Sequence, residues 1–163
     1  MELNVVEFGR KHLLEVDDAR IIFRNFAGVG GMYNREGDRS FSLVIPTEEY
    51  KDMLIDLGYN VRIKEPKSEG QDVLMHLPVK VSYKIEAPKV YLESGNGRPR
   101  ELDETTIAIL DNVDIERVDM DISPSYWTNP RGESGVSAYL KHIIVTQRVD
   151  RFAARYEDFA DNE

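Results

Sequence analysis

The feature that most constrains this chain is a succession of short strand-like segments ended by glycine or proline. The segments are rich in β-branched and aromatic residues, or they alternate polar and apolar side chains as half-buried strands do. They cover residues 19–28, 40–46, 59–66, 73–85, 89–95, 113–124 and 137–149. Such a pattern predicts a mainly β fold with inserted helices, arranged as a closed or half-closed antiparallel barrel. A two-sheet sandwich satisfies the same pattern and stays the structural alternative.

Two segments are predicted to be helical. In residues 47–58, Thr47 can cap the first turn, apolar residues recur at helical spacing, and Gly58 provides a stop. Residues 103–112 predict a shorter helix that begins at Asp103.

The strand-like segments are predicted to pair with their neighbours in the chain. Segment 40–46 is the expected hairpin partner of 19–28, and 89–95 that of 73–85. Residues 96–102 and 123–136 are predicted loops. A five-stranded oligonucleotide-binding (OB) barrel with insertions fits this order best.

The length of 163 residues predicts one domain, residues 1–150, followed by an acidic tail at 151–163. The absence of cysteine excludes disulfides and cysteine metal sites. No apolar run approaches the ~18 residues of a membrane span, and the N-terminus lacks the apolar core of a signal peptide. We therefore expect a cytoplasmic protein without membrane contact.

A glycine-rich loop at residues 28–41 is the first candidate binding element. Its glycines let a backbone approach a ligand closely, Arg35 and Arg39 can pair with phosphates, and Tyr33 offers a stacking face. The spacing is not that of a nucleotide-binding P-loop. The alternative is a long hairpin whose arginines pair with neighbouring carboxylates.

A basic stripe follows in residues 79–100. Lysines alternate with apolar residues along the predicted strand, which places the lysines on one face and gives a positive track for a nucleic-acid backbone. Tyr83 can be either a core residue or a stacking platform, and an ordinary solvated strand face is the alternative. The basic members are Lys80, Lys84, Lys89, Arg98 and Arg100.

The predicted loop 123–136 holds the third cluster. It contains the single tryptophan, Trp127, beside Tyr126 and close to Arg131. Exposed aromatics in a polar loop favour a binding role. The alternative is that they fold back over one end of the barrel.

The charge balance opposes a nucleic-acid ligand at first sight, because 30 acidic against 21 basic residues give a net charge of −9. Part of this charge lies in residues 156–163, which combine four carboxylates with Tyr156 and Phe159. An acidic tail with aromatics can imitate single-stranded DNA in a basic groove. It can also be a solubility device, or the end of a docked helix.

Catalytic patterns are weaker. Asp119 and Asp121 share one strand face and could hold Mg²⁺ with a third carboxylate, but no nuclease-like partner set follows them. The three histidines lack metal-ligand spacing, and no triad is recognisable. We expect a protein that is not an enzyme and needs no cofactor or metal.

Four segments carry a resemblance to a known family: "NFAGVGGMYNREGDRSFSLVI", "LPVKVSY", "DIERVDMDISPSYW" and "AYLKHIIVTQRVDRFAARYEDF". Together they resemble small bacteriophage single-stranded DNA-binding proteins over residues 19–159. The resemblance implies an OB barrel that coats single-stranded DNA in replication or recombination in the host cytoplasm. It also implies a homodimer and an acidic tail that recruits replication proteins. The chain lacks the glutamine- and glycine-rich linker and the tail tip of the bacterial type.

Two other functions stay open on the sequence. A phage structural or adaptor protein could use the same aromatic loops to bind protein, and a metal-dependent nuclease could use Asp119 and Asp121.

Overall fold

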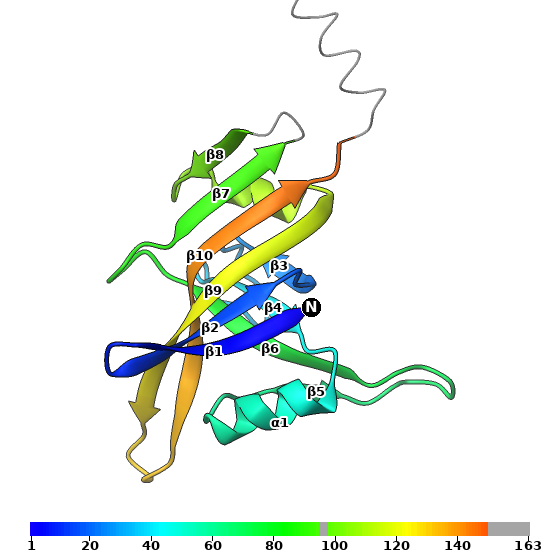
Figure 1. Cartoon of the computed structure of the whole chain (residues 1–163), viewed down its shortest axis with the longest axis vertical. Helices are drawn as coiled ribbons and strands as arrows, with labels where there is room; N and C mark the ends of the chain where they lie inside the picture. The colour runs from blue at the N-terminus through cyan, green and yellow to red at the C-terminus, as the bar shows by residue number, and fades with distance from the viewer. Residues whose placement is uncertain (95–97, 150–163) are drawn as a thin grey trace, which may run out of the picture.

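The computed structural model describes residues 1–94 and 98–149, which form ten strands, one α-helix and one 3₁₀ helix (Figure 1). The helices are α1 (Glu48–Asp56) and η1 (Ile107–Asp111). The strands are β1 (Glu2–Phe8), β2 (Lys11–Asp17), β3 (Ile21–Asn25), β4 (Arg39–Val44), β5 (Arg62–Lys64), β6 (Leu74–Val81), β7 (Lys89–Ser94), β8 (Arg98–Leu102), β9 (Ile115–Thr128) and β10 (Ser134–Gln147).

All ten strands belong to one sheet, whose main path runs β1-β2-β9-β10-β6-β4-β3. The prediction of a mainly β, OB-fold-like chain with inserted helices is confirmed. The sheet differs from a fully antiparallel barrel in two ways. It does not close, since β1 and β3 end the main path, and β10 pairs in parallel with both β6 and β7.

The long strand β10 organises the sheet because it changes partners along its length. Ala138 and Tyr139 pair with β6, whereas residues 142–146 pair with β7. The antiparallel register with β9 shifts between Leu140 and His142, so Lys141 lies at an irregularity typical of a β-bulge. The same edge of β10 therefore pairs first with β6 and then with β7, and the β6–β7 connection (residues 82–88) spans the gap between them. We call this gap the β10 fork.

Where the local sequence signals were strong, the predicted elements form. The Thr47 hydroxyl accepts a hydrogen bond from the Tyr50 backbone N–H at 3.2 Å and caps α1. The hairpin of β3 and β4 is also confirmed.

Three local predictions are wrong. β6 and β7 do not form a hairpin, because β6 lies between β4 and β10 and β7 lies between β10 and β8. Residues 98–102, predicted as loop, form β8 against β7. Most of the predicted loop 123–136 is strand: β9 continues through the buried Pro124 to Thr128, and β10 begins at Ser134. Residues 1–17 add a hairpin, β1–β2, that the sequence reading did not assign.

The core lies on one side of the sheet and is built from alternate residues of the strands. Leu14, Val79 and Ile122 are fully buried there, and the rings of Phe26 and Phe41 stack at 5.3 Å. Because side chains alternate along a strand, the remaining residues of β4, β6, β9 and β10 face away from the core. We call this second side of the sheet the outer face.

Candidate nucleic-acid interface

A row of four paired residues crosses the outer face from β4 through β6 and β10 to β9. It consists of Ser40, Lys80, Tyr139 and Ser123, each directly opposite the next. The Lys80 ammonium lies 5.7 Å from the centre of the Tyr139 ring, within the range of a cation–π contact. The outer face thus offers a positive charge and an aromatic ring side by side.

Trp127 belongs to the same face, near the end of β9. It lies on the same side of the strand as Ser125 and Ser123. Its direct partner on β10 is Gly135. The indole lies across this glycine, since a Cβ on Gly135 would be 2.7 Å from the Trp127 Cζ2 atom. The ring is 43% exposed, so the hairpin covers part of it and leaves the rest to solvent.

Tyr126 points to the opposite side of the hairpin. Its hydroxyl lies 3.4 Å from Nδ1 of His12, whose Nε2 lies 2.8 Å from the Tyr59 hydroxyl. Burial lowers the pKa of His12 and raises that of Tyr59. The sequence prediction that Tyr126 and Trp127 share one loop site is therefore wrong in its geometry: the two rings lie on a strand and face opposite ways.

A second aromatic group extends the outer face beyond β4. Phe23 is 58% exposed and has a positive φ of 53°, a conformation that non-glycine residues rarely adopt. Its ring meets the His76 ring edge-on at 5.3 Å, and His76 Nδ1 lies 3.0 Å from the Ser42 hydroxyl. Burial lowers the pKa of His76, and the nearby cations Arg62 and Lys64 lower it further. The local field here is positive.

At the other side of β10, Lys141 contributes another cation. Its ammonium lies 4.1 Å from the centre of the Phe8 ring, close enough for a strong cation–π contact. Phe8 is 55% exposed at the end of β1. This contact holds the lysine in place while leaving both groups accessible.

The glycine loop between β3 and β4 is ordered by its own hydrogen bonds. The Asn34 side-chain amide donates to three backbone carbonyls of the loop, and the Gly37 N–H donates to the Gly28 carbonyl at 2.8 Å. Tyr33, 96% exposed, lies near the tip. Arg35 is exposed and forms no ion pair among the described residues, so the reading of this loop as a DNA contact stays a prediction.

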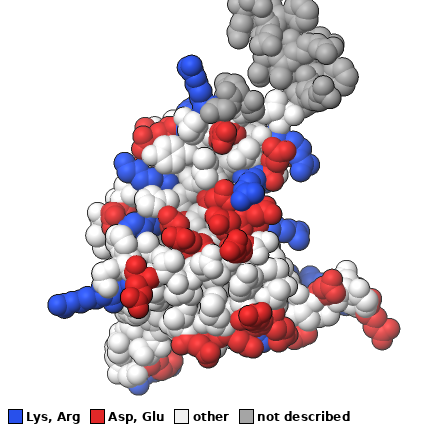
Figure 2. Space-filling model, in the orientation of Figure 1, with Lys and Arg blue, Asp and Glu red and all other residues white. Residues whose placement is uncertain are grey.

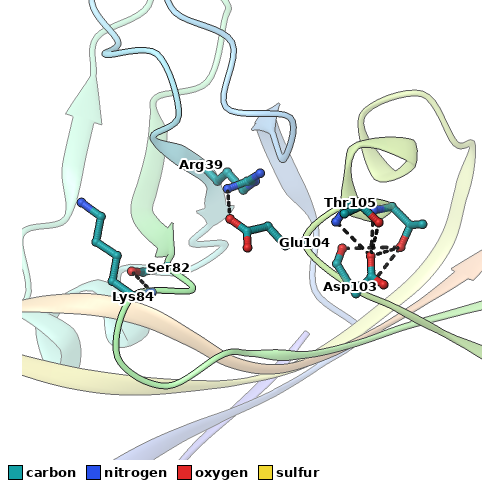
Figure 3. A network of polar contacts seen from close by, with 7 residues as sticks. Arg39, Ser82, Lys84, Asp103, Glu104 and Thr105 are labelled. Carbon is teal, nitrogen blue, oxygen red and sulfur yellow. Dashed lines mark hydrogen bonds and ion pairs between the residues drawn. The ribbon is translucent and has the colours of Figure 1, made fainter.

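Arg39 and Tyr83 have a structural environment. The Arg39 guanidinium lies 5.5 Å from the centre of the Tyr83 ring and pairs with Glu104 at 3.5 Å (Figure 3). Burial raises the pKa of Tyr83. Next to Glu104, the Thr105 hydroxyl and N–H donate to Asp103 and lower the pKa of its carboxyl. These contacts favour a role in joining β4 to the 103–106 turn over a role in binding phosphate.

Lys84 does not share a strand face with Lys80, because β6 ends at Val81. Lys84 lies in the connection to β7, where its N–H donates to the Ser82 hydroxyl and its side chain extends away from the Arg39–Glu104 pair (Figure 3). The predicted stripe is thus a strand lysine followed by a turn lysine.

The remaining predicted cations fall into two groups, one on the paired strands β7 and β8 and one in the β9–β10 turn. Lys89 on β7 pairs loosely with Glu101 at 3.8 Å, and Arg98 and Arg100 are exposed on β8. Arg131 is exposed in the β9–β10 turn, at the opposite end of the molecule from β8 (Figure 1). The predicted residues therefore do not form one compact site, although a nucleic-acid strand several nucleotides long could pass several of them.

An acidic surface bounds the candidate interface. Figure 2 shows carboxylates gathered over β2 and β9 and over α1. On β9, Asp119 binds the Arg117 guanidinium at 3.1 Å and accepts from the Asp18 N–H, while Asp121 lies 2.9 Å from His142. Within the described part of the chain, no three or more histidine, aspartate or glutamate side chains lie together so that they could hold a metal ion. The nuclease alternative thus gains no geometric support.

Sequence reasoning missed Phe23, Tyr139 and Lys141. Each lies in a segment that reads as an ordinary strand, and no local signal says which side of the sheet is covered. The alternation of Lys80 with buried valines was the signal that predicted the solvent-exposed face of this strand.

Solved structures with the same fold come from bacteriophage Enc34. Its single-stranded DNA-binding protein in complex with ssDNA superposes with a TM-score of 0.53 at 17% identity, covering 90% of this chain and 96% of that one. The same phage protein in a second structure gives a TM-score of 0.51 at 18% identity, with 95% and 99% covered. At this identity the likeness establishes the β-rich fold alone.

The sequence itself identifies the family. Residues 5–163 match the family model described as "Putative phage ssDNA-binding domain". The chain belongs to this family of phage single-stranded DNA-binding domains, whose members are not enzymes. No curated protein matches the chain significantly. Over residues 1–94 and 98–149, no helix is long and apolar enough to cross a membrane.

Proposed function

We propose that this protein binds single-stranded DNA without sequence specificity, through the outer face of β6 and β10. The observation that carries the proposal is the family match over residues 5–163, almost the whole chain. A solved structure of the Enc34 protein, which has the same fold, is of its complex with ssDNA, and this supports the same ligand here.

The outer face has the chemistry that sequence-independent binding requires. Lysine ammonium groups neutralise phosphates wherever the strand lies, and aromatic rings stack on any base. Lys80 and Lys141 supply the charge, and Tyr139 and Trp127 supply the rings. β10 has 14 residues and is about 45 Å long, enough for several nucleotides of extended strand.

The acidic residues restrict the path of the strand. Asp119, Asp121 and Glu15 lie over the middle of β9 and β2, where a phosphate backbone would be repelled. The favoured path therefore follows β10 and β6 and avoids β2. Tyr33 and Arg35 of the glycine loop are proposed as a further contact at the β4 end of this face.

We propose that the protein coats single-stranded DNA during phage replication or recombination in the host cytoplasm, as a homodimer. The acidic segment 151–163 lies outside the described residues. We propose that it recruits replication proteins and competes with DNA for the outer face of β6 and β10.

The test is a titration of labelled oligo-dT, duplex DNA and RNA at several salt concentrations. We expect salt-sensitive binding to oligo-dT, weaker binding to duplex, and no cleavage. Lys80→Ala should weaken binding and lower the salt slope by about 0.7. Lys51→Ala is a charge-matched control, since Lys51 pairs with Glu48 on α1, away from the proposed face. Absence of oligo-dT binding would instead favour the adaptor-protein alternative.

A further inference from the structure

A hollow of about 290 Å³ opens at the fork of β10. It exists because β6 ends at Val81 and β7 begins at Lys89, so that residues 82–88 cross the gap between the two parallel partners of β10. The register shift between β9 and β10 falls at the same point, next to Lys141. The hollow is a consequence of the topology and not of one flexible side chain.

The lining combines cations, hydroxyl groups and one aromatic ring. Its polar members include Ser82, Lys84, Ser123, Ser125, Tyr139 and Lys141. Apolar contacts come from Pro124 and Leu140 on the sheet side, and Glu86 is the only carboxylate in the lining. Two lysines against one carboxylate leave the hollow with a positive balance, which suits a ligand that carries phosphate.

Two cation–π contacts involve residues that line the hollow. The Lys141 ammonium is held against the Phe8 ring, and the Lys80 ammonium lies over the Tyr139 ring, just outside the hollow. At the rim, Ile85 is fully exposed, an unusual state for a large apolar side chain. An apolar residue in that position can cover a planar ligand that enters beneath it.

The size limits the ligand. The volume lies at the lower end of the roughly 300–1,000 Å³ typical of small-molecule sites. It accommodates one nucleobase with its sugar and excludes a stacked pair of nucleotides.

We propose that the hollow at the β10 fork receives a single nucleobase turned out of the bound strand, with the adjoining phosphates on Lys84 and Lys141. The inference rests on the proposed single-stranded DNA binding and deepens it. The outer face then contains two kinds of contact: open stacking on Trp127, and enclosure of one base against Tyr139.

The experiment uses oligo-dT that carries 5-iododeoxyuridine, a thymine analogue that crosslinks to neighbouring aromatic residues on irradiation. Mass spectrometry of the irradiated complex should place a crosslink on Tyr139. Ser125→Trp fills the hollow without changing charge, and we expect it to abolish that crosslink and to weaken binding about fivefold or more. Ser68→Trp, in the exposed β5–β6 connection, is the matched control and should behave as wild type.

The outcomes separate the two proposals. If wild type binds oligo-dT but Tyr139 is not crosslinked and Ser125→Trp binds normally, the base pocket is wrong while DNA binding stands. If wild type does not bind oligo-dT, both are wrong. Should Ser125→Trp fail to fold, Tyr139→Leu keeps the apolar bulk and removes the ring, and the same loss of affinity is expected.

Discussion

Replacing the single tryptophan is the most informative perturbation of the outer face. The Trp127 indole packs against Gly135, and 43% of the residue's surface is exposed and available to a base. Stacking on an aromatic side chain is worth roughly 1–3 kcal/mol per base. Trp127→Ala should therefore weaken binding to oligo-dT by about fivefold to 150-fold, measured by fluorescence anisotropy of a labelled oligonucleotide.

Loss of packing must be distinguished from loss of stacking. The covered part of the indole contributes on the order of 2 kcal/mol to the hairpin, so Trp127→Ala also lowers thermal stability. Trp127→Phe should restore most of the affinity. Gly135→Ala keeps the indole but places a methyl group within 2.7 Å of it, which forces the ring to move and should also weaken binding.

The neighbouring tyrosine supplies the control for this series. Tyr126 contacts His12 on the other side of the hairpin, so Tyr126→Ala should leave affinity unchanged. Equal losses for Tyr126→Ala and Trp127→Ala would refute the assignment of faces. Unchanged affinity for Trp127→Ala would refute stacking on this residue.

Three further predictions follow. Arg39→Ala should lower the melting temperature more than it lowers DNA affinity, since Arg39 pairs with Glu104, and thermal denaturation beside anisotropy separates the effects. Burial lowers the pKa of His12 from its ordinary 6.5, so the fold favours the neutral ring. The stabilising contribution of the neutral His12 ring is complete above pH 6.5 and declines as the pH falls below that value. We expect His12→Gln to flatten this part of the plot of folding stability against pH. If the tail competes for the outer face of β6 and β10, deleting residues 156–163 should tighten oligo-dT binding, and most strongly at low salt. Reduced affinity together with lower thermal stability would instead support a docked helix.

The sequence predicted elements whose determinants lie within a few residues. Helix α1 follows from the Thr47 cap and its apolar spacing, and the β3–β4 hairpin follows from two strands around a glycine loop. In both, the partner is the next segment in the chain, and local propensity is sufficient.

The pairing of β6 and β7 was not predictable in the same way. Both segments have strong strand patterns, and a short connection favours a hairpin. Their parallel pairing with β10 depends on residues about 50 positions away and on the bulge next to Lys141. The end of β9 was predicted at Pro124 because proline usually ends a strand. Here Pro124 lies buried within the strand, which continues to Thr128.

The sequence predicted which kinds of side chain, cations and aromatic rings, make up the candidate site, but only some of the particular residues. Lys80 and Trp127 were predicted because charged residues alternate with apolar residues around Lys80 and because a tryptophan in a polar segment is unusual. Tyr139 and Lys141 were missed because the covered side of a strand is set by the whole sheet. Tyr126 was misplaced because adjacent residues of a strand face opposite ways.

The central claim is that single-stranded DNA occupies the outer face of β6 and β10, and lysine-reactivity footprinting tests it most directly. The protein is acetylated briefly with and without saturating oligo-dT, and mass spectrometry compares the modification of each lysine. Lys80, Lys84 and Lys141 should lose reactivity on binding, while Lys51 on α1 and Lys67 in the β5–β6 connection keep theirs. Unchanged reactivity of Lys80 and Lys141 in a fully bound sample would contradict the account.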